Sequence, residues 1–494
     1  MQTIEKKINQ HVTEPLSTKM VKGGLWVFAL RFINRGLGFI RNIVLARLLA
    51  PEDFGLLGIA MLAISTLETF SQTGFQAALV QKKENVESYL NTAWTVSAIR
   101  GGILFVLLFL SSPLIARFFN SPQATLIIRV IAVTVLLSGL KNIGIIFFEK
   151  ELEFNKQFFY QLSGTLTNFG VAIVLAFVLK NVWALVWGGL AFSFVQLFMS
   201  YIVHPYRPKV RFEKTKFVEL FRFGKWLLAQ SIAIFLITQG DDIFVGKMLG
   251  VTALGFYQMA YLISNLPATQ ITHVISGVTF PAYSKMQDDL VRMKKACLRV
   301  LGLTGAISIP MSAGIFVLAS ELTQVILTEK WMPMVTVLQV MCLFGAMRSI
   351  AATFGPVYRA IGRPDIPLKI NIAHLLSLCL IIYPLGVRWQ LFGIAVGITL
   401  TMVLALVLTS LKIMSVLEIK FINLLRPMRT PFLASGGAAL TVLGTKGLVK
   451  HVNLYSLFFF MVVGLAMYIM LTWASNRILK SDGIGILKLI KSQG

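Results

Sequence analysis

Charged residues, cysteines and histidines are all scarce in this sequence. Asp, Glu, Lys and Arg together make up 14% of its 494 residues, whereas a soluble globular chain carries about a quarter. Hydrophobic residues reach 56%, and the mean hydropathy is +0.76. These values exclude a soluble globular protein and predict an all-α polytopic membrane protein.

Cysteine and histidine patterns that hold metals or carry out catalysis are absent. Cys297, Cys342 and Cys379 lie at or inside apolar segments without metal-binding or redox spacing, and the five histidines are scattered. The sequence also lacks the Gly-x-x-x-x-Gly-Lys-Ser/Thr phosphate loop and the His-Glu-x-x-His zinc motif. We therefore expect no ATP hydrolysis by this chain, no metal site and no cofactor.

Acidic residues are the scarcer of the two charged classes, with 21 Asp and Glu against 46 Lys and Arg and a net charge of +25. An excess of this size can indicate a nucleic-acid partner. Here the basic residues concentrate in alternate short loops, on the side of the N-terminus, as the positive-inside rule describes. We therefore expect no nucleic-acid partner, and we predict that both termini are cytoplasmic.

Long apolar runs fill most of the chain and are separated by loops that contain Pro, Gly, Asn and Asp. No loop exceeds about twenty residues, so a separate soluble domain is not expected. The runs predict fourteen transmembrane helices, near residues 23–49, 54–80, 92–112, 124–147, 159–179, 182–203, 218–249, 253–281, 297–319, 333–357, 367–387, 391–411, 431–449 and 454–474.

The first half of the chain is similar to the second at an offset of 200 residues. Residues 22–70 and 222–270 align without gaps and share nine identities, which include two glycines and a tryptophan. The identical pairs are Gly24/Gly224, Trp26/Trp226, Ala29/Ala229, Ile43/Ile243, Leu49/Leu249, Gly55/Gly255, Ala60/Ala260, Leu62/Leu262 and Thr69/Thr269. Each unit contains six spans, an even number, which predicts two parallel six-helix repeats that form two lobes, followed by two C-terminal helices.

This repeat predicts the domain organisation. The expected parts are an N-terminal tail (1–22), an N-lobe (23–203), a cytoplasmic linker (204–217), a C-lobe (218–411), a loop with the last two spans (412–474) and a C-terminal tail (475–494). Two lobes of this kind rock around a central cavity in transporters.

Cations inside the predicted spans indicate a binding cavity, because a charge that faces lipid is costly. The first span carries a polar stripe at helical spacing, and similar local sequences around Lys141 and Arg348 place one further cation in each half. The predicted substrate-binding residues are Arg31, Asn34, Arg35, Arg41, Lys141 and Arg348. For Arg31, and more so for Arg100 and Arg129, snorkelling to the membrane interface is the alternative interpretation.

Three carboxylates lie well inside the predicted spans: Glu68, Asp241 and Asp242. Their burial favours a role in ion coupling or gating, although a purely structural ion pair remains an alternative. The excess of cations predicts an anionic substrate such as a pyrophosphate, because Arg presents several donors to phosphate oxygens. A carboxylate-bearing drug or sugar would suit the same charges.

Several segments resemble the Wzx-type polysaccharide flippases, exporters of colanic-acid-like and teichuronic-acid-like polymers within the multidrug/oligosaccharidyl-lipid/polysaccharide (MOP) exporter superfamily. The likeness runs from about residue 20 to residue 420. It is carried by Phe54-Gly55-Leu56-Leu57, Lys150-Glu151-Leu152-Glu153-Phe154-Asn155-Lys156, Phe223-Gly224-Lys225-Trp226-Leu227, Leu254-Gly255-Phe256-Tyr257, Phe280-Pro281-Ala282-Tyr283-Ser284-Lys285 and Gly362-Arg363-Pro364.

The resemblance implies a transporter of the cytoplasmic (inner) membrane, not an enzyme. Its substrate would be an undecaprenyl-pyrophosphate-linked oligosaccharide repeat unit, moved between leaflets by alternating access for surface polysaccharide export. It further implies contact with membrane lipids and with other polysaccharide-assembly proteins, and a coupling ion, Na⁺ or H⁺. A cation-coupled drug exporter of the same fold is the main alternative, and a membrane polymerase or glycosyltransferase of the same pathway is a weaker one.

Overall fold

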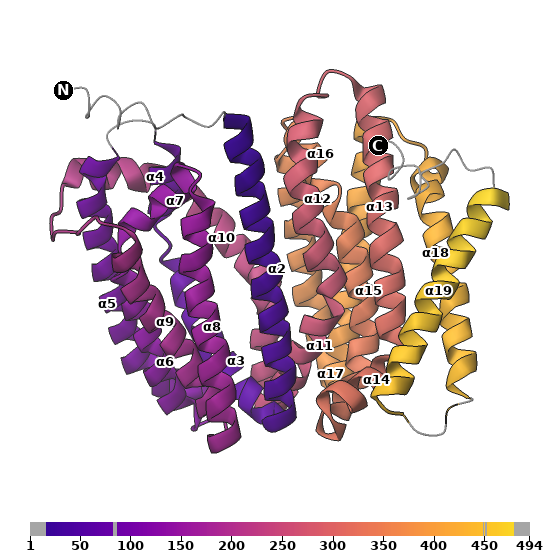
Figure 1. The fold of residues 1–494 in the computed structure, drawn as a ribbon, viewed down its shortest axis with the longest axis horizontal. Helices are drawn as coiled ribbons and strands as arrows, with labels where there is room; N and C mark the ends of the chain where they lie inside the picture. Colours follow the sequence, from indigo (N-terminus) through magenta and orange to yellow (C-terminus); the bar gives the residue numbers. More distant parts are fainter. Residues whose placement is uncertain (1–15, 83–85, 448, 450–451, 479–494) are drawn as a thin grey trace, which may run out of the picture. The chain divides into compact units, whose positions relative to one another are not determined.

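The structure is a computed structural model that describes residues 16–82, 86–447, 449 and 452–478. Every regular element in these residues is a helix (Figure 1), which confirms the predicted all-α class. The chain divides into two units, residues 1–235 (unit 1) and residues 236–494 (unit 2). The division falls inside one long helix, about twenty residues after the linker that the sequence predicts.

Unit 1 is a bundle of helices with short connections. Its elements are α2 (Leu16–Leu48), α3 (Pro51–Phe70), α4 (Phe75–Gln81), α5 (Glu87–Phe118), α6 (Ala124–Gly139), the 3₁₀ turn η1 (Ile143–Ile145), α7 (Ile146–Lys150), α8 (Phe154–Leu179), α9 (Trp183–Val203) and the first part of α10 (Lys214–Leu249). Helix α3 shows how a loop sequence starts a helix. Pro51 occupies its first turn, and the Asp53 carboxylate accepts the Ala50 N–H at 2.8 Å.

Two predicted spans of unit 1 are interrupted rather than continuous. Residues 71–74 separate α3 from α4, and Gly74 adopts a φ of 66°, a conformation that favours glycine. Residues 140–142 separate α6 from η1 and α7, and the axis bends there by 69°. Both positions carry short polar stretches, Ser-Gln-Thr-Gly at 71–74 and Lys-Asn at 141–142, inside longer apolar runs. The sequence pattern predicts each run as a single helix, and the structure breaks it at the polar stretch.

Unit 2 contains the rest of α10 and eleven further helices or helical turns. They are α11 (Val251–Ser264), α12 (Leu266–Ser284), α13 (Leu290–Val317), α14 (Ala319–Leu322), the π turn η2 (Thr323–Leu327), the 3₁₀ turn η3 (Glu329–Met334), α15 (Val335–Ala352), α16 (Gly355–Ala360), α17 (Asp365–Leu417), α18 (Phe421–Lys446) and α19 (Leu454–Ile478). Here too, two predicted spans are interrupted, at Asn265 between α11 and α12 and at residues 353–354 between α15 and α16.

Helix α17 is two antiparallel helices joined by a very short turn. Trp389 and Gln390 have non-helical backbone angles, with Gln390 at a positive φ of 49°. The Cα of Gly393 faces the Leu385 carbonyl so closely that a Cβ would lie 2.0 Å from its oxygen. The two spans predicted at 367–387 and 391–411 are therefore present as a tight hairpin.

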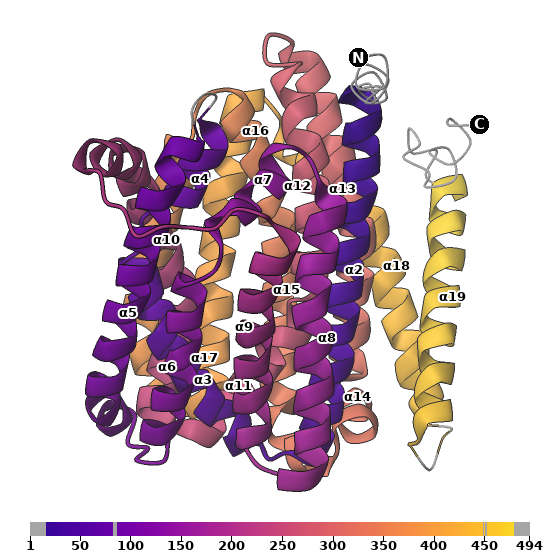
Figure 2. The same ribbon diagram turned by 60° about the vertical axis from the view of Figure 1, so that its left-hand side comes forward.

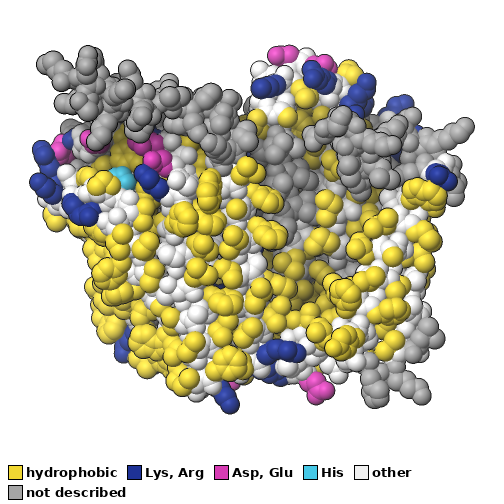
Figure 3. All heavy atoms as spheres, in the orientation of Figure 1, with side chains coloured by type: hydrophobic (Ala, Val, Ile, Leu, Met, Phe, Trp, Pro, Cys, Tyr) yellow, Lys and Arg dark blue, Asp and Glu magenta, His cyan; other side chains and the backbone are white. Residues whose placement is uncertain are grey.

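The lengths and compositions of the helices are those of a multi-pass membrane protein. Among the described residues, eight helices are long and apolar enough to cross a membrane, and a ninth span results if the bent pair α6 and α7 is counted as one. Apolar side chains cover the sides of the unit 1 bundle, and basic residues gather near the end that carries α4 and α7 (Figure 3). The full count of fourteen spans remains a prediction, because helices that carry several charges, such as α2, are not apolar enough to be counted as spans.

Close contacts between small residues fix helix pairs within each unit. In unit 1, the Cα atoms of Gly101 on α5 and Gly139 on α6 approach so closely that a Cβ on either would lie 3.0 Å from the other. In unit 2, Gly345 of α15 approaches the end of α11 so closely that a Cβ would lie 2.2 Å from the Ser264 carbonyl oxygen. Small residues allow this backbone approach where no hydrophobic effect drives helices together.

Candidate functional site: a polar cavity and a charged cluster

A cavity of about 930 Å³ lies inside unit 1. Residues of α2, α4, α5, α6, η1, α7, α8 and α9 line it, including the carboxylate of Glu149 on α7. Both interruptions also contribute, through residues 72–74 and residues 141–142. Irregular backbone at membrane depth is tolerated only where it is buried in protein or lines a water-filled cavity. Discontinuous helices also form the substrate and ion sites of many transporters. The cavity is therefore a candidate ligand site.

Two half-buried cations line this cavity. Lys141 lies between the end of α6 and the start of η1. Arg100 lies on α5, where its Nε donates to Ser71 Oγ (3.0 Å) and its Nη2 donates to the Glu68 carbonyl oxygen (2.9 Å). The two hydrogen bonds hold Arg100 in place, and both positive charges are half-buried, so they attract an anion more strongly than fully hydrated charges do.

The carboxylate of Glu68 interacts electrostatically with both Arg100 and Lys141. One negative charge faces two positive ones, so this group keeps a net positive charge. Glu68 thus lies beside the cavity cations, where its charge would compete with that of an anionic ligand.

Amide and aromatic side chains make up much of the remaining lining. The glutamines among them are Gln72, Gln76, Gln157, Gln161 and Gln196, and the aromatic residues are Phe75, Phe148, Tyr160 and Phe192. Glutamine both donates and accepts hydrogen bonds, as sugar hydroxyl groups do. A lining of this kind matches a polar, uncharged group next to an anionic one.

Helix α2 contributes Asn34 to the cavity lining. The Oδ1 atom of Asn34 is buried and accepts no hydrogen bond within the part of the chain that the structure describes. A buried acceptor without a donor is costly. A ligand or water donor in the cavity would satisfy it.

The three predicted arginines of α2 differ in their surroundings. Arg31 is exposed, Arg35 is half-buried one turn further on, and the two like charges repel each other. Arg41 is half-buried and donates to the side chains of Asn168 on α8 and of Asn42 (2.9 Å from Nη2). Among the described residues, Arg41 is therefore the arginine of this stripe that is hydrogen-bonded to a neighbouring helix of unit 1.

A separate cluster in unit 2 contains the two predicted aspartates. Asp241 on α10 is 5% exposed and accepts a hydrogen bond from the Tyr257 hydroxyl of α11. Asp242 accepts one from Gln258. In each carboxylate the Oδ1 atom is buried and has no partner among the described residues. Two buried oxygens of this kind suit a proton or a hard cation such as Na⁺.

Arg348 on α15 belongs to the same cluster. Its Nη1 donates to the Tyr261 hydroxyl and to Asn265 Oδ1 (3.1 Å), next to the interruption between α11 and α12. Its charge also interacts with Asp241 and with His374, whose Nε2 lies 3.2 Å from Thr401 Oγ1. Arg348 is thus engaged by neighbours in its own unit.

The structure brings the sequence-predicted residues together in two groups. Lys141, Asn34 and Glu68 gather at the unit 1 cavity, and Arg348, Asp241 and Asp242 gather in the unit 2 cluster. Sequence reasoning missed Arg100 as a cavity residue, because snorkelling was the simpler interpretation for a cation near a predicted span end. The available signal was its placement opposite Glu68 in the neighbouring span.

An apolar pocket of about 580 Å³ lies elsewhere in unit 2, between α13, α18 and α19. Almost all of its lining is hydrophobic. It includes Pro310, Met311, Leu322, Val442, Phe458 and Leu465. The last two helices of the chain therefore help to form a site for apolar groups.

The sequence matches the model of the family described as "Polysaccharide biosynthesis protein" over residues 44–336. The chain belongs to this family. Among polysaccharide biosynthesis proteins, it is 29% identical over 398 residues to the lipopolysaccharide biosynthesis protein WzxC of Escherichia coli (strain K12), which covers 80% of each chain. It is 26% identical over 295 residues to the teichuronic acid biosynthesis protein TuaB of Bacillus subtilis (strain 168), 59% of this chain and 61% of that one. The predicted family resemblance is confirmed.

Solved structures show that this polysaccharide biosynthesis protein shares a transporter fold. The lipid II flippase MurJ in an inward closed conformation matches with a TM-score of 0.74 and 15% identity, over 92% of this chain and 99% of that one. An inward-facing multidrug resistance MATE family transporter of the MOP superfamily matches with a TM-score of 0.57 and 15% identity, over 76% and 94%. The fold is therefore similar to that of the MurJ flippase and of a MATE transporter.

Proposed function

We propose that this protein is a flippase that moves an undecaprenyl-pyrophosphate-linked oligosaccharide repeat unit across the cytoplasmic membrane by alternating access. The observation that carries the proposal is the unit 1 cavity, which combines two cations with amide and aromatic side chains. Its support comes from relatives named for lipopolysaccharide and teichuronic acid biosynthesis and from the fold of a lipid II flippase.

The chemistry of the cavity matches a sugar diphosphate. Arg100 and Lys141 would hold the diphosphate oxygens, since charge-assisted hydrogen bonds are among the strongest that proteins make. The glutamines and Asn34 would meet sugar hydroxyl groups. The apolar pocket of α13, α18 and α19 suits part of a polyprenyl chain. Each part of the substrate thus has a matching surface in the chain.

The other predicted cations extend this assignment. We propose that Arg31, Arg35 and Arg41 form a cationic path along α2 and that Arg348 contributes a cation from unit 2. Asp241 and Asp242 would bind the coupling ion, Na⁺ or H⁺, through their unpartnered oxygens. Glu68 would take part in coupling by competing with the substrate for Arg100 and Lys141.

The architecture that fits this function has fourteen spans in two parallel six-helix repeats, with two further helices and both termini in the cytoplasm. The corresponding pairs of interrupted helices support the repeat. Breaks follow α3 and α6 in unit 1, and α11 and α15 in unit 2. Membrane lipids and other polysaccharide-assembly proteins would be its partners in the inner membrane.

A cation-coupled drug exporter of the same fold is the second candidate, because a MATE transporter shares the fold. The two cations of the unit 1 cavity disfavour a cationic drug as cargo, since like charges repel. A polymerase or glycosyltransferase would require a catalytic centre, and the fold match to transporters favours transport instead.

Flipping of a fluorescent polyprenyl-pyrophosphate oligosaccharide by the purified protein in liposomes tests the proposal, with and without imposed Na⁺ and pH gradients. We expect protein-dependent movement of the head group between leaflets that is lost in Arg35→Ala and Lys141→Ala. Arg117→Ala is a matched control, because it removes an exposed cation at the end of α5. Gradient-driven efflux of a soluble drug without head-group movement would replace the flippase with the exporter.

A further inference from the structure

The segment that joins α9 to α10, residues 204–213, is bonded to unit 1 along both edges, and we name it the strap. Figure 2 shows it crossing the end of unit 1 that carries α4 and α7. It has no regular secondary structure. Its backbone groups therefore depend on side chains of neighbouring helices for hydrogen bonds.

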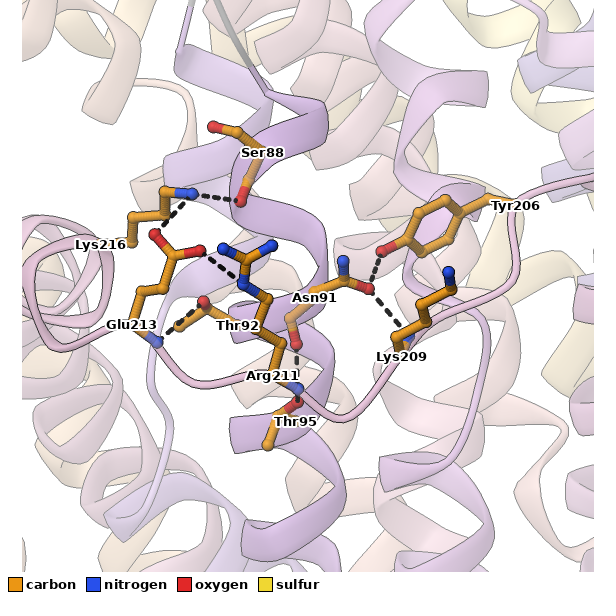
Figure 4. A network of polar contacts seen from close by, with 9 residues as sticks. All are labelled: Ser88, Asn91, Thr92, Thr95, Tyr206, Lys209, Arg211, Glu213 and Lys216. Carbon is orange, nitrogen blue, oxygen red and sulfur yellow. Dashed lines mark hydrogen bonds and ion pairs between the residues drawn. The ribbon is translucent and has the colours of Figure 1, made fainter.

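One edge of the strap lies against the start of α5 (Figure 4). Asn91 Oδ1 accepts hydrogen bonds from the Tyr206 hydroxyl (2.6 Å) and from the Lys209 N–H (2.8 Å). Thr95 Oγ1 accepts the Arg211 N–H at 3.0 Å. Since Arg100 lies five residues beyond Thr95, this edge of the strap is attached about 7.5 Å from one cavity cation along the helix axis.

An ion-pair network secures the end of the strap. The Glu213 carboxylate contacts Arg211 Nε (3.0 Å) and Lys216 Nζ (2.8 Å), and Lys216 also donates to the Ser88 carbonyl oxygen (2.9 Å). The hydrogen bond from Lys216 lowers the pKa of Glu213 below its ordinary value, so the carboxylate stays charged at neutral pH.

The other edge of the strap holds the interruption that carries Lys141. Asn142 is fully buried, and its Nδ2 donates to the carbonyl oxygens of Tyr206 (2.6 Å) and His204 (3.4 Å). Its Oδ1 accepts the Gly144 N–H at 2.9 Å. One side chain thus joins the strap to the turn that follows Lys141.

The His204 ring forms a second contact with this turn. It stacks on Phe147, with ring centroids 5.6 Å apart, and faces Gly144. A Cβ on Gly144 would lie 2.4 Å from His204 Nδ1, closer than any real contact. An alanine at position 144 would therefore displace the His204 ring or the turn itself.

We propose that the strap is a positioning element for Lys141, with Asn142 and His204 as the positioning residues that set where this cation lies beyond the end of α6. It connects α5, which carries one cation, to the interruption that carries the other. The inference rests on the proposed function, because it assigns both cations to one anionic ligand. A shift of about 1 Å in the position of one cation is enough to weaken the binding of a ligand that both cations contact.

Gly144→Ala tests the contact, and Gly144→Ala with His204→Ala tests whether removing the ring relieves it. The control is Gly102→Ala on α5, where a new methyl group meets no atom within 4 Å. Two properties are measured in the full chain in detergent. They are the affinity for inorganic pyrophosphate and, with the three native cysteines replaced by alanine, the rate at which an anionic thiol reagent modifies Lys141→Cys.

We expect Gly144→Ala to weaken pyrophosphate binding about tenfold and to change the thiol rate about threefold or more, with the control unchanged. Adding His204→Ala should return both values to within about twofold of the parent. If Gly144→Ala does not fold, Asn142→Ala, which leaves two strap carbonyls without that donor, should shift both readouts in the same direction.

An unchanged thiol rate in both Gly144→Ala and Asn142→Ala would overturn the positioning role, as would a defect that His204→Ala does not reverse. Failure of the unmodified protein to flip lipid-linked oligosaccharide or to bind pyrophosphate would overturn the proposed function instead. The thiol rates do not depend on transport, so they still decide whether the strap positions residue 141.

Discussion

Lys141 in unit 1 and Arg348 in unit 2 lie at corresponding places in similar local sequences, yet their surroundings differ. Lys141 lies within an interruption and lines a cavity of about 930 Å³. Arg348 lies inside a continuous helix and donates to Tyr261 and Asn265. The cation within the helix break therefore faces a cavity, whereas the cation placed before the break donates hydrogen bonds to neighbours in its own unit.

The carboxylates follow the same division. Glu68 in unit 1 faces two cations that it cannot fully neutralise. Asp241 and Asp242 in unit 2 each keep a buried oxygen without a partner among the described residues. Unit 1 therefore offers positive charge and unit 2 offers negative charge, which suits a substrate anion in one and a coupling cation in the other.

The largest expected effect is on folding stability in unit 2. Arg348→Ala should destabilise the protein by about 1–3 kcal/mol, because it leaves the Tyr261 hydroxyl and the buried Asn265 Oδ1 without their donor. Lys141→Ala, at a cavity surface, should cost less than about 1 kcal/mol. Thermal unfolding in detergent measures both. A stable Arg348→Ala protein that cannot bind pyrophosphate would make Arg348 a ligand contact equivalent to Lys141.

For pyrophosphate binding we expect the opposite order, with a larger effect at Lys141 than at Arg348. Lys141→Ala should weaken pyrophosphate binding by about 10- to 100-fold, since a hydrogen bond to a charged group contributes about 1.5–3 kcal/mol. Lys141→Arg, which keeps the charge, is the matched control. Titration of the purified protein with pyrophosphate measures both. Equal affinities for wild type and Lys141→Ala would show that the unit 1 cavity does not bind the diphosphate group through Lys141.

A moderate effect is expected on coupling. Asp242→Asn should abolish the acceleration of flipping by an imposed Na⁺ or pH gradient, while flipping without a gradient stays within about threefold of wild type. Flipping in liposomes with each gradient in turn measures this. If the variant still responds to both gradients, the unit 2 cluster is structural and the division of roles between the units fails.

The smallest effect concerns the exposed ion pair of Arg363 and Asp365, which provides a reference for the buried charges of unit 2. Hydrogen bonding from Arg363, and then from Lys369, lowers the pKa of Asp365 to about 2. Because the folded pKa is below the unfolded value of about 3.9, the stabilisation is present above pH 4 and is lost as the pH falls towards 2.

Asp365→Asn should accordingly lower the unfolding temperature slightly at pH 7, and the difference should shrink as the pH is lowered towards 3. The effect should be small because the pair is exposed and screened by water. A loss of stability as large as that of Arg348→Ala would show that burial does not decide how much a charged contact stabilises this protein.

The spans were predictable from the sequence because each is a run of about twenty apolar residues. The interruptions were not, since short polar stretches such as those at residues 71–74 and 141–142 also occur within continuous spans, and tertiary contacts decide whether the helix breaks there. Lys141 and Asn142 stood out as polar residues in an apolar run. Arg100 did not, because the predicted span begins at residue 92. The helix begins at Glu87, so Arg100 lies about 20 Å from its start.

The contact of Gly101 with Gly139 also provides a reference distance within unit 1, between α5 and α6. Backbones that approach this closely cannot slide or separate without losing the contact, so α5 and α6 must move as one body. Spectroscopic labels placed on these two helices should report a constant distance at every stage of a transport cycle. A label pair with one partner on either helix and the other elsewhere in the chain can therefore be calibrated against this fixed distance.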